Sequence, residues 1–576
     1  MNDQTFTCLA ISDFNVDNAV GYLTNNPERP AVQAIAAPFG QVIQVLMDDS
    51  MECWKHRPEM AIIWTQPHAV IESFRQLHDH KTVSLETILK EVDSYASVLM
   101  RVTHRVKCAI VPSWVVPASQ RASSMQDMKH ECGIANILMR MNLRLAEHLD
   151  QAPNMHLLNA QKWIEASGQR AVNPKLWYMA KVPFGNEVFR EAAKDVKAVL
   201  RGIHGQAKKL ILLDLDETLW GGTVGETGWE RLLLGGHDPV GEAFVDFQQA
   251  LKALSHRGIL LGVVSKNQED VALEAIEKHP EMVLRTKDLA GWKINWQDKA
   301  QNVVDLVSEL NLGLQSVVFL DDNPLERARV REALPEVLVP EWPDDPMLYR
   351  QALFGLSCFD APSVSQEDRE RTQMYVTERE RTRLKTRVGS LDEWLQTLEM
   401  MVKIDELNSA HLPRAVQLLN KTNQMNLSTR RMTESELSAW ADRPDRRVWT
   451  VHVSDKFGSS GLTGLVSVEV REEIGTIVDY LLSCRVMGRK VEETMLAVAI
   501  QYLQSRSVTN IVAHYRPTKN NAPILEFWKR SGLRYDEATN AFHWDPDRSY
   551  PVPPQITLKV DAVTPGRPDQ LETVRS

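Results

Sequence analysis

Two aspartates that follow a short apolar run constrain the fold of this chain more than any other feature. Residues 211–213 are all apolar, Asp214 and Asp216 come next, and Thr218 and a glycine-rich turn follow. An apolar run bounded by turn signals is typical of a buried parallel strand. Because strand side chains alternate between faces, Asp214 and Asp216, two residues apart, can share a direction at the strand end. The sequence therefore predicts a parallel α/β sheet with acidic chemistry at the carboxyl edge of its strands.

Further polar residues follow apolar runs downstream. One run ends in Ser265, a later one ends in Asp321 and Asp322, and a helical pattern between them begins near Lys299. Parallel strands end at the same edge of a sheet, so we expect these side chains to lie near Asp214.

This set of side chains fits phosphoryl transfer, which depends on a nucleophile, metal-binding carboxylates, a hydroxyl and a cation. We expect Asp214 to attack phosphorus, and Ser265 and Lys299 to hold the phosphoryl group. Lys293 is the alternative to Lys299. The candidate oxygen ligands for Mg2+ are Asp214, Asp216, Asp321 and Asp322.

Composition narrows the class of protein. A chain of 576 residues with 43% hydrophobic residues is long enough for three or four domains. The net charge of -10 argues against general nucleic-acid binding. No apolar run reaches the about 18 residues of a membrane span, and the N-terminus does not read as a signal peptide. The six cysteines form no CxxC pair, which argues against a disulfide framework or structural zinc, so we expect a cytoplasmic protein.

The chain is expected to divide into three folded regions, a linker and a tail. Residues 1–205 alternate short apolar runs with helical patterns, as in a parallel sheet, and residues 206–358 carry the phosphoryl-transfer motifs. A charged helical linker is expected over 359–389, a third αβ region over 390–548, and a flexible, proline-containing tail over 549–576.

The third region contains two consecutive strand patterns, a glycine-bearing turn and a helical pattern over 491–505. Backbone N–H groups at such a turn form a natural pyrophosphate site. The succession resembles the coenzyme A half of a GNAT acyltransferase, with Arg485 and Gly488 matching the turn motif of that family. Lys490 stands where the motif has a small residue, so the turn departs from that pattern.

Cys484 is the candidate nucleophile of the third region. Its expected position, at a strand end beside Arg485, Arg489 and a helix N-terminus, would favour the thiolate form. A buried structural cysteine fits the same pattern equally well.

The three regions together resemble the FkbH-like proteins, a branch of the haloacid dehalogenase (HAD) superfamily found in polyketide biosynthesis. Asp214, Asp216 and Thr218 match motif I (DxDxT) of that superfamily. The segments that carry the wider resemblance are 176–184, 214–226, 319–324, 421–430 and 482–489. The resemblance implies a HAD-like, Rossmann-type parallel sheet core, preceded by an SGNH-hydrolase-like α/β domain and followed by a GNAT-like αβ domain. The sequence around Ser12 lacks a convincing SGNH nucleophile motif, so we expect the first domain to be non-catalytic.

The resemblance also implies a function, acyl loading coupled to dephosphorylation. Such an enzyme takes a three-carbon unit from a phosphorylated donor such as 1,3-bisphosphoglycerate and places it on the pantetheine thiol of an acyl carrier protein. Either Cys484 or the pantetheine thiol attacks the donor, and Asp216 serves as the general acid and base. The candidate substrate or pantetheine contacts are Thr218, Asn423, Arg430, Arg485 and Gly488. Helix-cap and surface roles for Asn423 and Arg430 fit their positions equally well.

Two other functions are consistent with the sequence. The first is a stand-alone phosphatase of a small metabolite, which needs Asp214 but neither Cys484 nor a carrier protein. The second is a GNAT acyltransferase that uses acetyl-coenzyme A, with the phosphatase-like region as a scaffold. The acyl group, the carrier and the pathway are not predicted by any residue.

Overall fold

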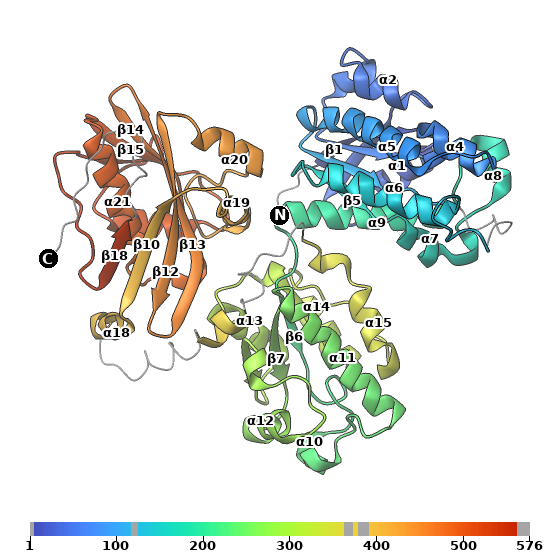
Figure 1. Ribbon diagram of the computed structural model, residues 1–576. Helices are drawn as coiled ribbons and strands as arrows, with labels where there is room; N and C mark the ends of the chain where they lie inside the picture. The colour runs from blue at the N-terminus through green and yellow to red at the C-terminus, as the bar shows by residue number, and fades with distance from the viewer. Residues whose placement is uncertain (1–4, 117–124, 362–371, 378–390, 561–576) are drawn as a thin grey trace. The chain divides into compact units, whose positions relative to one another are not determined.

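The computed structural model describes most of the chain (Figure 1), which divides into two compact units. The described residues are 5–116, 125–361, 372–377 and 391–560. The two units are Met1–Arg201 and Gly202–Ser576. The described residues form one sheet in the first unit and two separate sheets in the second. Helices long and apolar enough to cross a membrane do not occur among them.

The first unit is a five-stranded parallel sheet flanked by helices. The strand order is β2-β1-β3-β4-β5. The strands are β1 (Thr5–Ser12), β2 (Ala31–Ala36), β3 (Met60–Trp64), β4 (Cys108–Pro112) and β5 (Met155–Leu158). The helices are α1 (Asp17–Asn25), α2 (Val42–Met47), α3 (Pro67–Val70), α4 (Glu72–His78), α5 (Leu85–Met100), α6 (Ile134–Leu149), α7 (Gln161–Ser167), α8 (Pro174–Ala180) and α9 (Asn186–Ile203). Every residue of β3 and β4 is buried, as expected for strands covered on both faces.

A four-stranded parallel sheet with the order β8-β7-β6-β9 begins the second unit. Its strands are β6 (Leu210–Leu213), β7 (Leu260–Ser265), β8 (Gly291–Ile294) and β9 (Val317–Leu320). Its helices are α10 (Val224–Thr227), α11 (Pro239–His256), α12 (Glu269–Lys278), α13 (Lys299–Glu309), α14 (Pro324–Ala333) and α15 (Tyr349–Phe354). Leu213 is in register with both Val263 and Leu320, so three strands end close to one edge. This edge is where the sequence predicts the acidic chemistry.

The other sheet of the second unit is mixed. Its order is β16-β17-β15-β14-β13-β12-β10-β18, and β11 pairs with β14. Its strands are β10 (Met400–Glu406), β11 (Met425–Asn426), β12 (Arg446–Asp455), β13 (Gly458–Arg471), β14 (Ile474–Leu482), β15 (Asn510–His514), β16 (Arg534–Asp536), β17 (Ala541–Trp544) and β18 (Ile556–Val560). Its helices are α18 (Leu391–Leu398), α19 (Leu412–Lys421), α20 (Glu434–Ala441), α21 (Val491–Ser505) and α22 (Ala522–Arg530). The predicted pair of strands is the antiparallel hairpin β13–β14, and the predicted helix after it is α21.

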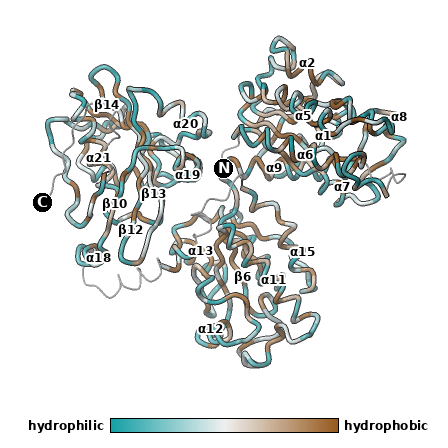
Figure 2. Tube along the Cα trace, in the orientation of Figure 1, coloured by the Kyte–Doolittle hydropathy of each residue, from teal (hydrophilic) through white to brown (hydrophobic). Residues whose placement is uncertain are grey.

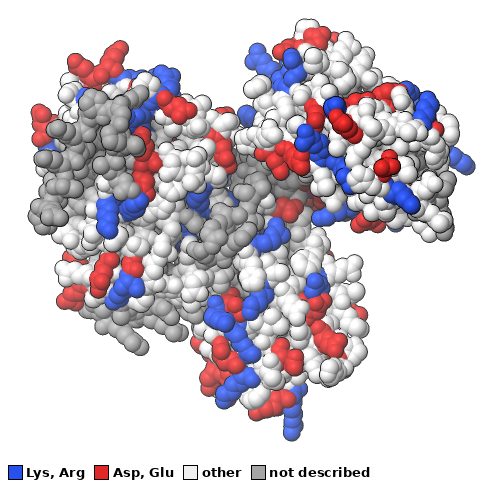
Figure 3. All heavy atoms as spheres, in the orientation of Figure 1, with Lys and Arg blue, Asp and Glu red and all other residues white. Residues whose placement is uncertain are grey.

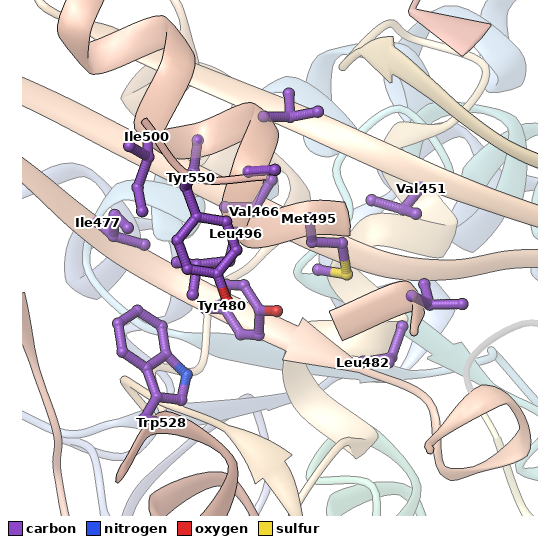
Figure 4. Close-up of a cluster of buried hydrophobic side chains, with 14 of the residues drawn as sticks. Val451, Val466, Ile477, Tyr480, Leu482, Met495, Leu496, Ile500, Trp528 and Tyr550 are labelled. Carbon is purple, nitrogen blue, oxygen red and sulfur yellow. The ribbon is translucent and has the colours of Figure 1, made fainter. Parts of the chain in front are cut away.

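The core of this mixed sheet is built around Tyr480 and helix α21 (Figure 4). Tyr480 is fully buried, and its ring packs edge-on against Trp528 with 5.2 Å between ring centroids. Its hydroxyl donates a 2.5 Å hydrogen bond to the backbone carbonyl of Glu492. Since a buried hydroxyl is costly without a partner, this bond fixes the first turn of α21 against β14.

Hydropathy and charge follow the expected division between interior and surface. Figure 2 shows hydrophobic residues concentrated in the central strands and hydrophilic residues in the outer turns. On the face drawn in Figure 3, basic and acidic side chains of the described residues are interspersed. This mixture is consistent with the small net charge of -10 for 576 residues.

The structure contradicts the predicted flexible tail over its first twelve residues. Tyr550 is 7% exposed and packs against Trp544, with 5.3 Å between ring centroids. β18 pairs in parallel with β10 along its whole length. A single short edge strand after several prolines carries no periodic signal, which is why the sequence pattern missed it. Residues 561–576 and most of the predicted linker, 359–389, lie outside the described residues.

Tyr550→Ala should lower the free energy of unfolding by about 3 kcal/mol, because it removes a buried aromatic side chain from the core. Chemical denaturation of the full chain measures the change. Val560→Ala, at a half-exposed position of β18, is the matched control and should change stability by less than about 1 kcal/mol. Equal, near-zero effects of the two substitutions would restore the flexible-tail interpretation.

Candidate active site

Three carboxylates meet at the carboxyl edge of the four-stranded parallel sheet. Asp214 directly follows β6, and its backbone N–H donates to the carbonyl of Leu320 at the end of β9. This bond extends the pairing of the two strands by one step and holds Asp214 beside Asp321. One oxygen from each of Asp214, Asp321 and Asp322 lies within 4.8 Å of the others. Asp321 is fully buried and Asp214 nearly so.

Lys299 places a buried ammonium group among these carboxylates. Its Nζ lies 3.0 Å from Asp214 Oδ2 and 2.6 Å from Asp321 Oδ2. Asp298 caps the N-terminus of α13 through hydrogen bonds from two backbone N–H groups, so Lys299 is the first residue of that helix. Burial opposes the charged form of Lys299, but the two carboxylates outweigh it and raise the pKa of the ammonium. Lys299 therefore stays cationic at neutral pH.

The alternative lysine lies elsewhere. Lys293 is on β8 and its Nζ pairs with Glu309 Oε1 at 2.5 Å. Lys299 is thus the lysine that contacts the acidic group.

Thr218 connects the turn after β6, which holds Asp214 and Asp216, to Asp322. Its hydroxyl donates to Asp322 Oδ1 at 3.0 Å and accepts from the Asp322 backbone N–H at 3.1 Å. Thr218 is fully buried, and the expected contact with substrate is therefore replaced by a positioning contact with Asp322.

The three carboxylates together have the properties of a cation site. Asp214 Oδ1 is buried and accepts no hydrogen bond from any described residue. Burial, and then the charge of Asp214, raises the pKa of Asp321 to about 7 despite the nearby ammonium of Lys299. Burial is also the main cause of the raised pKa of Asp322, and the charge of Asp214 is the second cause. Three carboxylates with one ammonium leave an excess of negative charge, and their oxygens suit a hard divalent cation such as Mg2+.

The Asp216 carboxylate lies outside this group, contrary to the expectation that it is a fourth side-chain ligand. Its Oδ1 accepts from Trp220 Nε1 at 2.8 Å and from the Val224 backbone N–H at 3.1 Å. Its Oδ2 accepts from Asn267 Nδ2 at 2.8 Å. These three donors turn the carboxylate away from the other acids and hold it in one orientation. Asp216 therefore keeps its candidacy as an acid and base rather than as a metal ligand.

Trp220 and Asn267 were not predicted from the sequence as site residues. Trp220 follows Asp216 by four positions, and Asn267 follows Ser265 by two, so both lie in loops at the same sheet edge. Asn267 could have been predicted, because it is a polar residue just beyond the end of an expected strand. Ser265 itself is the buried last residue of β7, next to β6 in the sheet.

In the mixed sheet, Cys484 lies in the turn between β14 and α21. β14 ends at Leu482, Cys484 begins a three-residue 3-10 turn, and α21 begins at Val491, where the sequence pattern placed the helix. Cys484 is partly exposed.

The turn that was expected to bind pyrophosphate is occupied by a carboxylate of the chain. The Gly488 backbone N–H donates to Glu492 Oε1 at 2.5 Å. Burial raises the pKa of Glu492 to about 7. Arg485 Nε donates to Ser483 Oγ at 3.2 Å. The N–H group of Gly488 is therefore already bonded to a carboxylate of the chain.

Asn423 and Arg430 are engaged within the fold, contrary to their expected role as substrate contacts. Asn423 Oδ1 accepts from Arg431 Nη2 at 2.7 Å. The Arg430 guanidinium forms an ion pair with the fully buried carboxylate of Asp479 and lies 4.9 Å from the ring centroid of Trp440. Arg430 therefore neutralises a buried acid, and a structural role replaces the binding role.

Comparisons with known proteins agree with this architecture. Residues 21–201 match the model of the FkbH N-terminal domain. This part of the chain is thus similar to the FkbH N-terminal domain. The resemblance to FkbH-like proteins predicted from the sequence is thereby confirmed.

A solved structure extends the comparison into the acidic site. The N-terminal part of the protein BF1531 from Bacteroides fragilis, which contains a phosphatase domain and was crystallised with Mg, is 28% identical to the chain. The match covers 62% of this chain and 95% of that one, with a TM-score of 0.57. The chain therefore carries a HAD-like phosphatase domain in addition to the region that matches the FkbH N-terminal domain.

The structural matches to acetyltransferases are more distant. The ribosomal-protein-S18-alanine N-acetyltransferase of Escherichia coli is 13% identical, with 25% of this chain and 91% of that one covered at a TM-score of 0.19. A GNAT-family acetyltransferase of Staphylococcus aureus is 8% identical, with 25% and 99% covered at a TM-score of 0.21. None of the curated proteins compared with the chain matches it.

The raised pKa of Asp321 predicts the pH dependence of stability without a cation. A carboxylate whose pKa is higher in the folded state binds more protons there, so its contribution to stability is lost as pH rises through the folded value. The melting temperature of chelator-treated protein should thus fall as pH rises from about 4 to about 7, and Mg2+ should remove most of this fall. Asp321→Asn should flatten the metal-free curve.

Asp246→Asn is the control for that experiment, because Asp246 lies on α11 in an exposed ion pair with Arg350 and is not one of the three clustered carboxylates. It should leave the pH slope of wild type in place. Equal slopes for wild type and Asp321→Asn would contradict a shifted carboxyl at this site.

Proposed function

We propose that the chain is a Mg2+-dependent phosphatase that also loads the acyl unit of a phosphorylated three-carbon donor onto an acyl carrier protein in polyketide biosynthesis. The observation that carries the phosphatase step is the ammonium of Lys299, shared by Asp214 and Asp321, beside an Asp214 oxygen that accepts no bond from any described residue. A nucleophile, a cation and acidic ligands at one sheet edge are the parts that phosphoryl transfer requires.

In the phosphatase step, an oxygen of Asp214 attacks phosphorus and forms an aspartyl phosphate. The bond from phosphorus to the substrate oxygen breaks, and Asp216 gives its proton to the leaving alkoxide. Asp216 then accepts a proton from a water molecule that attacks the phosphoryl group and releases Asp214. The three hydrogen bonds to Asp216 support this role, because they aim its carboxyl group independently of the metal-binding acids.

The remaining side chains hold charge and position. Lys299 neutralises the phosphoryl oxygens, and the Ser265 hydroxyl donates to one of them. Mg2+ held by Asp214, Asp321 and Asp322 would reduce the repulsion between the nucleophile and the phosphoryl group. Thr218 keeps Asp322 directed at this position.

In the acyl-transfer step, a thiolate attacks the acyl carbon of an acyl phosphate, and inorganic phosphate leaves. When the thiolate is that of Cys484, the pantetheine thiol then attacks the enzyme thioester and regenerates Cys484. The partial exposure of Cys484 and the resemblance to FkbH-like proteins support this assignment.

Acetyl-coenzyme A is a weaker candidate for the mixed-sheet region. A coenzyme A pyrophosphate needs free backbone N–H groups at the turn before α21, but Gly488 already donates to the carboxylate of Glu492. A pantetheine arm without a nearby pyrophosphate avoids this conflict.

A stand-alone phosphatase is the second candidate, and one observation favours it. Asp214, Asp216, Ser265, Lys299 and the two later aspartates all lie within residues 206–358. The phosphoryl chemistry therefore needs no side chain from the mixed sheet.

The test is the intact mass of a holo acyl carrier protein after incubation with the full chain, Mg2+ and 1,3-bisphosphoglycerate. We expect the carrier to gain a glyceryl group in the wild-type reaction. Asp214→Asn should slow phosphate-ester cleavage about a thousandfold and leave a phosphoglyceryl adduct on the carrier. Cys484→Ala should abolish loading if Cys484 carries the thioester.

Cys132→Ala is the matched control, because Cys132 is an exposed cysteine of the first unit and should not affect loading. Phosphate release that depends on Asp214 while the carrier keeps its mass would contradict acyl loading from this donor and favour the stand-alone phosphatase.

A further inference from the structure

A second cluster of metal-binding side chains lies on the mixed sheet, separate in sequence from the acidic site. Asp405 is on β10, His452 is on β12, and His411 precedes α19. One ligand atom of each lies within 4.8 Å of the other two. β10 and β12 are antiparallel neighbours in which Asp405 pairs with Thr450 and Lys403 with His452, so these four side chains share one face of the sheet.

Two polar atoms of this cluster are buried without a hydrogen bond from any described residue. They are Asp405 Oδ1 and His452 Nε2. Asp405 is 8% exposed. Lys403 Nζ lies 3.0 Å from Asp405 Oδ1 and partly balances the charge of that carboxylate. The geometry of this ion pair is not that of a hydrogen bond. Since unsatisfied buried polar atoms are costly, two such atoms on neighbouring side chains of one cluster favour a further partner there.

Thr450 fixes the tautomer of His411. Its hydroxyl donates to the backbone carbonyl of Asp405 at 3.2 Å and lies 3.3 Å from His411 Nδ1. Because the single hydroxyl proton is used on the carbonyl, the contact with His411 requires Nδ1 to donate. The lone pair of neutral His411 is then on Nε2, which is the arrangement that outer hydrogen bonds give to metal-binding histidines.

We propose that Asp405, His411 and His452 bind a divalent transition-metal ion of the zinc class. Two imidazoles and one carboxylate are typical ligands of Zn2+ and chemically unlike the all-oxygen group around Asp214. Tetrahedral Zn2+ with bonds of about 2.1 Å separates its ligand atoms by about 3.4 Å. Asp405 Oδ2 and His452 Nε2 are 3.9 Å apart, so a movement of about half an ångström brings this pair to the separation of tetrahedral ligands.

Three protein ligands leave the fourth position for water or another small ligand. His411 directly precedes α19, so a bound ion would tie the start of that helix to β10 and β12.

The test uses the full chain, stripped by a chelator and then held in saturating Mg2+ to occupy the acidic site. Equilibrium dialysis measures Zn2+ stoichiometry, and Co2+ absorption in the visible range reports the ligands. We expect one Zn2+ per chain and a Co2+ spectrum of low coordination number. Asp405→Asn and His452→Gln should each weaken Zn2+ binding at least about tenfold.

Two controls separate this site from others. His514→Gln, at an exposed position of β15, and Asp214→Asn, in the acidic site, should both retain the same Zn2+ binding. Circular dichroism checks that each variant is folded. Absence of Zn2+ binding in the presence of Mg2+, or unchanged binding by folded Asp405→Asn and His452→Gln proteins, would overturn the proposal.

Discussion

The ion pair between Lys299 and the carboxylates of Asp214 and Asp321 is the interaction on which the phosphatase site depends. Burying carboxylates in a parallel sheet edge is unfavourable unless their charge is balanced. Lys299 provides one positive charge at 2.6 and 3.0 Å, and α13 delivers it because Asp298 caps the helix at that residue. One ammonium does not balance three acids, so the site is built for a further cation.

Hydrogen bonding separates the acids of the site into two groups with different roles. Asp214, Asp321 and Asp322 converge, whereas Asp216 is held apart by three donors from the loops after β6 and β7. The two classes of acid can therefore serve different purposes, one group binding a cation and the other exchanging protons with the leaving group. Thr218 connects the classes, since it lies two residues after Asp216 and bonds to Asp322.

Much of this site could be predicted from the sequence, because buried parallel strands are apolar runs and their ends share an edge. That logic located Asp214, Ser265 and Asp321 at neighbouring strand ends. It did not predict the direction of Asp216, since a side chain just beyond a strand is oriented by donors such as Asn267, which are distant in sequence. The predicted parallel sheets of the first two regions and the predicted αβ character of the third agree with the structure.

Prediction was weakest where tertiary contacts override local patterns. Arg430 resembled a free binding residue, but its partner Asp479 lies 49 residues away on another strand. The strand β18 follows a proline-rich stretch and gains its place only by pairing with β10. Glu492 lies in the first turn of α21, where an acid is ordinary, yet it occupies the glycine turn expected to bind phosphate.

The most direct test of the central claim is to trap the covalent intermediate. The full chain would be mixed with Mg2+ and a phosphate-ester substrate, quenched in acid during turnover and reduced with borohydride, which converts an aspartyl phosphate to homoserine. Peptide mass spectrometry then locates the modified residue. The account predicts homoserine at position 214 and an unmodified Asp216. Modification of another acid, or substrate turnover with no reducible acyl phosphate at Asp214, would contradict it.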